Sequence, residues 1–189
     1  MNSLTSKIKN LKSWLIDVRR DLHKTPELGL EEFLTKEKII KYLEEIGIDY
    51  TTYPDHTGVM AYINKNAKNT VAIRADIDAL PIVETNNKSY KSIHSGKMHA
   101  CGHDVHTSIL LGVSKVLNEI KDEINGNVKF VDTSDFKSWV KNLENISEGD
   151  KSDVLTELKN HVSDMATEIK KEDVAGEMQY LYAILLKIN

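Results

Sequence analysis

Residues 70–75 read Thr-Val-Ala-Ile-Arg-Ala and are followed at once by two acids, Asp76 and Asp78. The run is short and mostly apolar, which predicts a buried strand in the centre of a sheet. In α/β sheets, ligands bind in the crevice beyond the carboxyl ends of such strands. A carboxylate there can bind a metal or orient a ligand imidazole. Loop acids that only form turns are the commoner alternative for Asp76 and Asp78.

The segments on either side of this strand alternate between two hydrophobic periods. Steps of three and four predict amphipathic helices, and short apolar runs bounded by turn residues predict strands. The helices are expected at residues 3–23, 31–46 and 105–123, and the strands at residues 48–53, 58–63, 70–75 and 128–131. This order predicts an α/β fold with a mixed sheet and flanking helices.

The chain changes in character after residue 131. Its length of 189 residues and its 40% hydrophobic content suit one globular domain or two small ones. From Asp132 onward, acidic residues outnumber basic ones and both Pro and Arg are absent. An apolar stripe with a/d-type spacing then runs through Leu155, Leu158, Val162, Met165 and Ile169. We therefore expect an α/β domain at residues 1–131 and an all-helical segment at residues 132–189.

Composition excludes several classes of partner and setting. The net charge of −4 gives no basic surface for nucleic acid. No run approaches the roughly 18 apolar residues of a membrane span, and residues 1–10 lack the apolar core of a signal peptide. A single cysteine excludes an internal disulfide framework, which favours a reducing compartment. We expect a cytoplasmic protein that binds neither nucleic acid nor membrane.

Residues 99–106, His-Ala-Cys-Gly-His-Asp-Val-His, carry the densest group of metal-binding side chains. They hold the single cysteine and three of the seven histidines. Cys101 and His103 can reach one ion from a tight turn, which Gly102 permits. Thiolate and imidazole suit zinc or a similar transition ion. The alternative is that Cys101 is a small buried hydrophobe and the histidines are surface residues, but the density of donors favours a site.

Four segments together resemble the M20 metallopeptidase family, in its amidohydrolase branch. That branch includes hippurate hydrolases, auxin-conjugate hydrolases and N-acetyl-diaminopimelate deacetylases. The segments are residues 19–29 (RRDLHKTPELG), 57–59 (TGV), 74–81 (RADIDALP) and 98–107 (MHACGHDVHT). The resemblance covers about residues 10–131 and corresponds to the N-terminal portion of a family member, with a zinc-peptidase-like mixed sheet.

The resemblance implies metal-dependent hydrolysis of the amide bond of N-acyl amino acids or similar small amides. Cys101 and His103 match the motif that supplies metal ligands. Asp78, with Asp76 beside it, matches the acid that hydrogen-bonds to a metal ligand without binding the metal itself. Two close metals, zinc or manganese, would clamp the scissile carbonyl and activate a water. A glutamate would act as general base. The substrate is then a small N-acylated amino acid. A homodimer is one assembly that the sequence leaves open.

The chain departs from the family pattern after Phe130. Family members continue into a Gln-Pro-Ala-Glu-Glu motif, which holds the general base and a metal ligand. Aligned without a gap, the two glutamate positions are occupied here by Phe136 and Lys137. A lysine beside a metal would repel it. We therefore expect at most one metal in this chain and assign no catalytic residue.

Three other residues are candidate substitutes for the missing ligands. Asp132 and Asp135 follow the last predicted strand and could reach a metal. His161 stands beside the apolar stripe of the C-terminal segment, which favours a core or flanking histidine over a ligand.

A second hypothesis is that the chain derives from this family but has lost its activity. The chain would be a catalytically inactive, truncated or fused remnant, whose helical tail packs on the domain or mediates a protein interaction. A third is that the α/β part is marginally stable alone and is rescued by dimerisation, which would cover its exposed apolar surface.

Overall fold

The computed structural model describes residues 2–134. The helices are α1 (Asn2–Asn10), α2 (Lys12–Lys24), α3 (Phe33–Ile46), α4 (His103–Glu119) and a short 3-10 helix (Lys121–Glu123). The strands are β1 (Asp49–Thr52), β2 (Val59–Ile63), β3 (Thr70–Ala75) and β4 (Asn127–Asp132). Most of the expected helical segment at 132–189 lies outside the described residues. So do four residues singled out in the sequence: Asp135, Phe136, Lys137 and His161.

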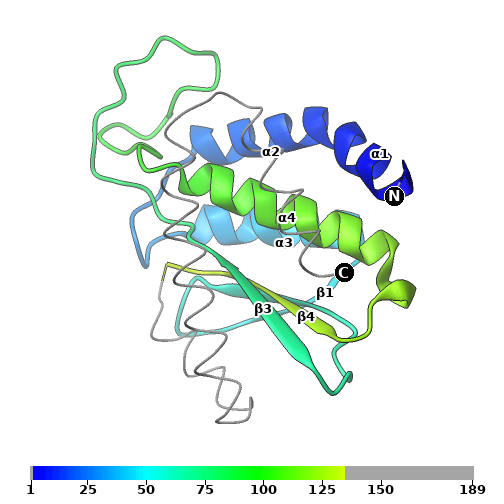
Figure 1. Cartoon of the computed structure of the whole chain (residues 1–189). Coiled ribbons are helices and arrows are strands. Elements are labelled where there is room, and N and C mark those ends of the chain that lie inside the picture. The colour runs from blue at the N-terminus through cyan, green and yellow to red at the C-terminus, as the bar shows by residue number, and fades with distance from the viewer. Residues whose placement is uncertain (1, 135–189) are drawn as a thin grey trace.

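The four strands form one mixed sheet in the order β1-β2-β4-β3. β2 pairs antiparallel with both β1 and β4, whereas β3 and β4 run parallel. Helices α2, α3 and α4 lie over one face of this sheet (Figure 1). The predicted α/β class with a mixed sheet and flanking helices is confirmed for this part of the chain. Among the described residues, no helix is both long and apolar enough to cross a lipid bilayer.

Among the described strands, β3 lies at an edge of the sheet, whereas the apolar run predicted a central position. Val71 on this strand is 49% exposed. Ala72 nevertheless packs with Met60 and Val131 in a small cluster, while Ala75 belongs to the main core. An apolar run therefore indicates that both faces of a strand contact other residues. It does not indicate whether the strand has one or two neighbouring strands in the sheet.

The N-terminal helix is interrupted once. A single helix was predicted at residues 3–23, but α1 ends at Asn10 and α2 begins at Lys12. Leu11 between them keeps right-handed helical angles (φ −78°, ψ −13°) and is buried. Its backbone N–H donates to Ile8 O at 3.1 Å, and Leu15 N donates to Leu11 O at 2.9 Å. The two helices thus continue the amphipathic pattern across one irregular residue.

Two further helix boundaries differ from the predicted ones for local reasons. α3 begins at Phe33, because the buried carboxylate of Glu27 accepts hydrogen bonds from the backbone N–H groups of Leu34 and Thr35. A carboxylate at this position also suits the positive end of the helix dipole. α4 begins at His103 and ends at Glu119, so the predicted span of 105–123 starts too late and runs into the 3-10 helix.

The main core fills the space between the helices and the sheet. Its largest fully buried apolar side chains include Phe130, Leu22, Ile39, Leu43, Ile77, Leu111 and Leu117. Each such side chain contributes roughly 1.5–3 kcal/mol through burial. This packing brings the carboxyl ends of β3 and β4 together, since Ala75 pairs with Asp132. The first turn of α4 lies beside the same edge, because Thr107 Oγ1 donates to the carbonyl of Asp76.

Candidate metal site

His103 is the first residue of α4, and the carboxylate of Asp78 orients its ring through a hydrogen bond. Its Nδ1 lies 2.9 Å from Oδ1 of Asp78 and 3.0 Å from the backbone oxygen of the same residue. A carboxylate and a carbonyl only accept hydrogen bonds, so Nδ1 carries the proton. Nε2 is then the nitrogen left for a metal, in the arrangement typical of metal-binding histidines. Gly102 permits this turn with φ +96°, as predicted.

Three potential ligands converge beside this pair. Asp76, His103 and His106 each offer one donor atom, and these atoms lie within 4.8 Å of one another. His103 and His106 are neighbours on one face of α4, and their rings stack with centroids 5.5 Å apart. Two imidazoles and one carboxylate are a ligand set that zinc and manganese both accept. The group therefore has the chemistry of a divalent-metal site.

The surroundings set the protonation of these groups. Burial lowers the pKa of His103, but the hydrogen bond and the charge of Asp78 outweigh it and raise that pKa above its usual value. The hydrogen bond from His103 in turn lowers the pKa of Asp78. Burial, helped by the nearby His103, lowers the pKa of His106. His106 is thus neutral near pH 7, which is the form that binds metal.

Asp76 is held in place by two neighbouring side chains, those of Arg74 and Thr107. Its carboxylate pairs with the guanidinium of Arg74, which also donates to the backbone oxygen of Thr133 at 2.9 Å. Its backbone oxygen accepts a hydrogen bond of 3.0 Å from Thr107 Oγ1. Asp76 is therefore fixed between β3, the end of β4 and α4. Its carboxylate pairs with the Arg74 guanidinium and also lies close to the two histidines of the metal-site group.

The other predicted site residues are placed differently. The thiol of Cys101 is exposed and lies outside the group formed by Asp76, His103 and His106. Asp76 lies among the donors, whereas Asp78 lies behind His103, although both were expected in the supporting role. Asp132 is only 1% exposed, and burial raises the pKa of its carboxyl to about 8. It belongs to no metal-binding group among the described residues.

Sequence reasoning missed two features of this region. His106 was not assigned as a ligand, although its spacing of three residues from His103 places both on one helix face. The second feature is a buried contact between His23, Asp104 and Glu84. No local pattern could have revealed it, because the partners of His23 stand 81 and 61 positions away in the chain.

Comparisons with known proteins connect the described part of the chain with one family. The model of peptidase family M20/M25/M40 matches residues 72–135. The N-acetylcysteine deacetylase of Bacillus subtilis is 47% identical over 119 residues, which cover 62% of this chain and 31% of that protein. The IAA-amino acid hydrolase ILR1-like 5 of Arabidopsis thaliana is 42% identical over 126 residues, covering 67% and 29% respectively. The chain spans about a third of the length of these relatives.

Solved structures agree with this placement. A dinuclear metal binding peptidase from the M20 family of Bacillus subtilis matches 65% of this chain and 35% of its own, with a TM-score of 0.61 and 44% identity. A putative aminohydrolase from methicillin-resistant Staphylococcus aureus matches 70% of this chain and 34% of its own, with a TM-score of 0.65 and 36% identity. The N-terminal portion of this chain is therefore similar to the peptidase M20 family, and within it to amide hydrolases.

Proposed function

We propose that this chain serves metal-dependent hydrolysis of the amide bond of N-acyl amino acids or similar small amides. The observation that carries the proposal is the position of His103, which Asp78 orients and which shares one donor group with Asp76 and His106. The names of the relatives support the substrate class. They describe a deacetylase of N-acetylcysteine and a hydrolase of IAA–amino acid conjugates.

The donor set fits a single zinc or manganese ion. His103, His106 and Asp76 would hold it, and Cys101 remains a candidate further ligand because its exposed thiol stands two residues before His103. A bound divalent metal would polarise the substrate carbonyl and lower the pKa of a coordinated water. The identity of the metal, zinc or manganese, is part of the proposal.

The residues of the chain have separate tasks in this proposal. Asp78 accepts a hydrogen bond from His103 Nδ1–H and so aims Nε2 at the donor group. His106 contributes a neutral imidazole, because burial depresses its pKa. Asp132 is mostly protonated at pH 7, because burial raises its pKa to about 8.

The general base is the weakest part of the proposed active site. Phe136 and Lys137 stand where the family resemblance expects two glutamates. Loss of a general base lowers turnover by about 10²–10⁴-fold. We therefore expect slow turnover by this chain, and we keep a second candidate function, in which the chain binds a metal without catalysis. The same two residues favour that second function, in which residues 132–189 form a separate segment that packs on residues 1–131 or binds a protein partner.

The direct test measures release of the amine from N-acetylcysteine, N-acetyldiaminopimelate and an IAA–amino acid conjugate, with zinc or manganese added. Wild-type chain is compared with His103→Ala and with the exposed control Asp49→Asn. Turnover that His103→Ala abolishes and the control retains supports amide hydrolysis. A chain that is fully loaded with metal and gives no turnover on any substrate supports metal binding without catalysis.

A further inference from the structure

We propose that a largely buried ionic network positions the first turn of α4 and through it the metal-binding residues His103 and His106. The network joins Arg19 and His23 on α2 to Asp104 on α4 and to Glu84 in the loop before α4. The inference rests on the metal site of the proposed function and does not depend on amide hydrolysis. It assigns the four residues a positioning role, since none of them belongs to the metal-site group.

His23 is the centre of the network. Its Nδ1 lies 2.7 Å from Oδ2 of Asp104, and its Nε2 lies 3.2 Å from Oε1 of Glu84. Both carboxylates are almost completely buried, as is the imidazole. Because the two ring nitrogens both face carboxylate oxygens, His23 must carry both protons and one positive charge. Removing that charge would leave the buried Glu84 without a cation and Asp104 with Arg19 as its one cation, which is destabilising.

Arg19 provides a second cation one turn earlier on the same helix face. Its Nε lies 2.8 Å from the same Oδ2 of Asp104. Its guanidinium also lies 5.2 Å from the ring centroid of Tyr90, and the ring of His23 meets Tyr90 edge-on at 5.6 Å. Two cations and two carboxylates thus balance one another, and Tyr90 covers them from the loop before α4.

The loop is tied into the network through Glu84. Its Oε2 accepts a hydrogen bond of 2.7 Å from the backbone N–H of Ser92, while its Oε1 faces His23. The backbone N–H of Ile93 also donates to the carbonyl of Lys24, at the end of α2, at 2.8 Å. Residues 84–93 are therefore held against α2 by both side chains and backbone.

The link to the metal site is the first turn of α4. The residue before this turn is Gly102, which has no side chain to cap the start of the helix. The turn is instead held on two faces, because His103 bonds to Asp78 and the next residue, Asp104, bonds to His23. A helix rotates about 100° per residue, so these two contacts prevent the turn from rotating about its own axis. Metal ligands need positions accurate to about 0.5 Å, so loss of either contact would misplace the donors.

One buried histidine lies between the network and the metal site. His99 is 5% exposed, and its ring centroid lies 6.2 Å from that of His23. Neither of its ring nitrogens has a hydrogen-bonding partner among the described residues, and nor does Oδ1 of Asp104.

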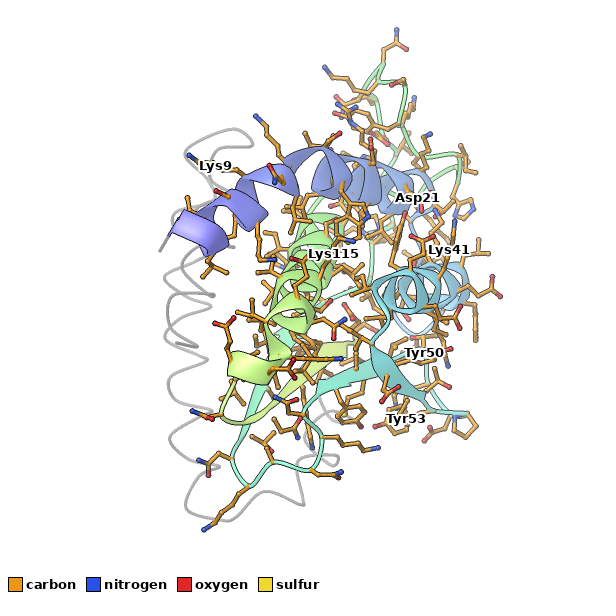
Figure 2. The ribbon with its side chains drawn as sticks, turned by 90° about the vertical axis from the view of Figure 1, so that its right-hand side faces the viewer. Lys9, Asp21, Lys41, Tyr50, Tyr53 and Lys115 are labelled. Atoms are coloured by element: carbon orange, nitrogen blue, oxygen red, sulfur yellow. The ribbon has the colours of Figure 1, made fainter. Side chains whose placement is uncertain are left out.

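The experiment titrates the full-length chain with cobalt(II), followed by its visible absorption and by competition with a chelator. The test variants are His23→Ala and the isosteric Glu84→Gln. Two controls lie on α2. Asp21→Asn removes a second ionic contact, to Lys38 and Tyr42, on the side of α2 that faces α3 (Figure 2). Val18→Ala lowers stability by opening a space in the core and removes none of the charged groups of the network.

We expect both test variants to bind cobalt about tenfold more weakly and with an altered absorption spectrum. Both controls should keep wild-type affinity and spectrum, even where their thermal stability falls equally. If His23→Ala does not fold, Glu84→Gln decides. Wild-type affinity and spectrum in the folded test variants would overturn the positioning role and leave the metal site standing. A wild-type chain that binds no cobalt would overturn the metal site and the positioning role together.

Discussion

The Nδ1 atom of His103 lies 2.9 Å from Oδ1 of Asp78, across 25 positions of the chain. This contact joins the start of α4 to the segment that follows β3 and fixes which nitrogen of His103 faces the metal-site group. It also explains two opposite changes in protonation. His103 lowers the pKa of Asp78, and Asp78 outweighs the effect of burial to raise the pKa of His103.

Substitution of Asp78 tests what the contact does. Asp78→Asn keeps a hydrogen-bond acceptor but removes the charge, so we expect about tenfold weaker zinc binding. Asp78→Ala removes both and should weaken binding by about 100-fold. Competition with a chromophoric chelator measures both affinities, with Asp49→Asn as the exposed control. Equal affinities for wild type and Asp78→Ala would contradict the assigned role.

Replacement of single candidate ligands should rank them by their contribution to zinc affinity. His106→Ala removes a residue of the three-donor group, whereas Cys101→Ser changes an exposed thiol outside it. We expect a larger loss of zinc affinity for His106→Ala than for Cys101→Ser. A larger loss for Cys101→Ser would contradict this ranking and show that the thiol binds the metal, the role that the family resemblance implies.

Gly102 should matter to both stability and metal binding. A side chain there would meet no atom within 4 Å, but φ is +96°, so Gly102→Ala costs about 1–2 kcal/mol through backbone strain alone. Gly47, at φ +78° after α3, provides a matched control with equally open surroundings. Urea denaturation should show similar losses in the free energy of unfolding for both alanine variants. Only Gly102→Ala should also weaken zinc binding, and an equal weakening by Gly47→Ala would refute the local explanation.

The buried carboxyl of Asp132 should make stability depend on pH. Its pKa is raised by burial to about 8 in the folded chain, against roughly 4 when unfolded. The folded state therefore holds a proton that the unfolded state has lost between these values. Stability from this group is fully present below about pH 4 and is lost as pH rises to about 8, at up to about 1.4 kcal/mol per pH unit.

Asp132→Asn provides the measurement. The variant keeps the size of the side chain but cannot ionise, so its free energy of unfolding should exceed that of wild type by an increasing amount from pH 5 to pH 8. Urea denaturation at several pH values gives this difference directly. A difference that does not change with pH would show that Asp132 ionises normally in the folded chain.

Local sequence patterns predicted where the strands and helices lie in the chain better than they predicted which elements lie side by side in the fold. The strands at 58–63, 70–75 and 128–131 match β2, β3 and β4 to within a residue or so, because extended apolar runs are a local property. The edge position of β3 depends on which strands pair, and composition does not contain that information. The break at Leu11 was equally hidden, since its apolar side chain continues the helical stripe.

The candidate site shows the same division. Gly102 and His103 were found from spacing within one short motif, because a turn and a neighbouring ligand are local features. The partnership of His23 with Asp104 and Glu84 depends on the packing of α2 against α4 and on the path of the intervening loop. Burial of Asp132 likewise follows from its pairing with β2 and β3, which the sequence of β4 alone does not determine.

The measurement that tests the central claim most directly is the zinc content of purified chain after exchange into zinc-containing buffer and removal of loosely held metal. The site formed by Asp76, His103 and His106 predicts about one zinc per wild-type chain and almost none in His103→Ala, while circular dichroism shows both folded. Equal zinc content in wild type and folded His103→Ala would contradict the account.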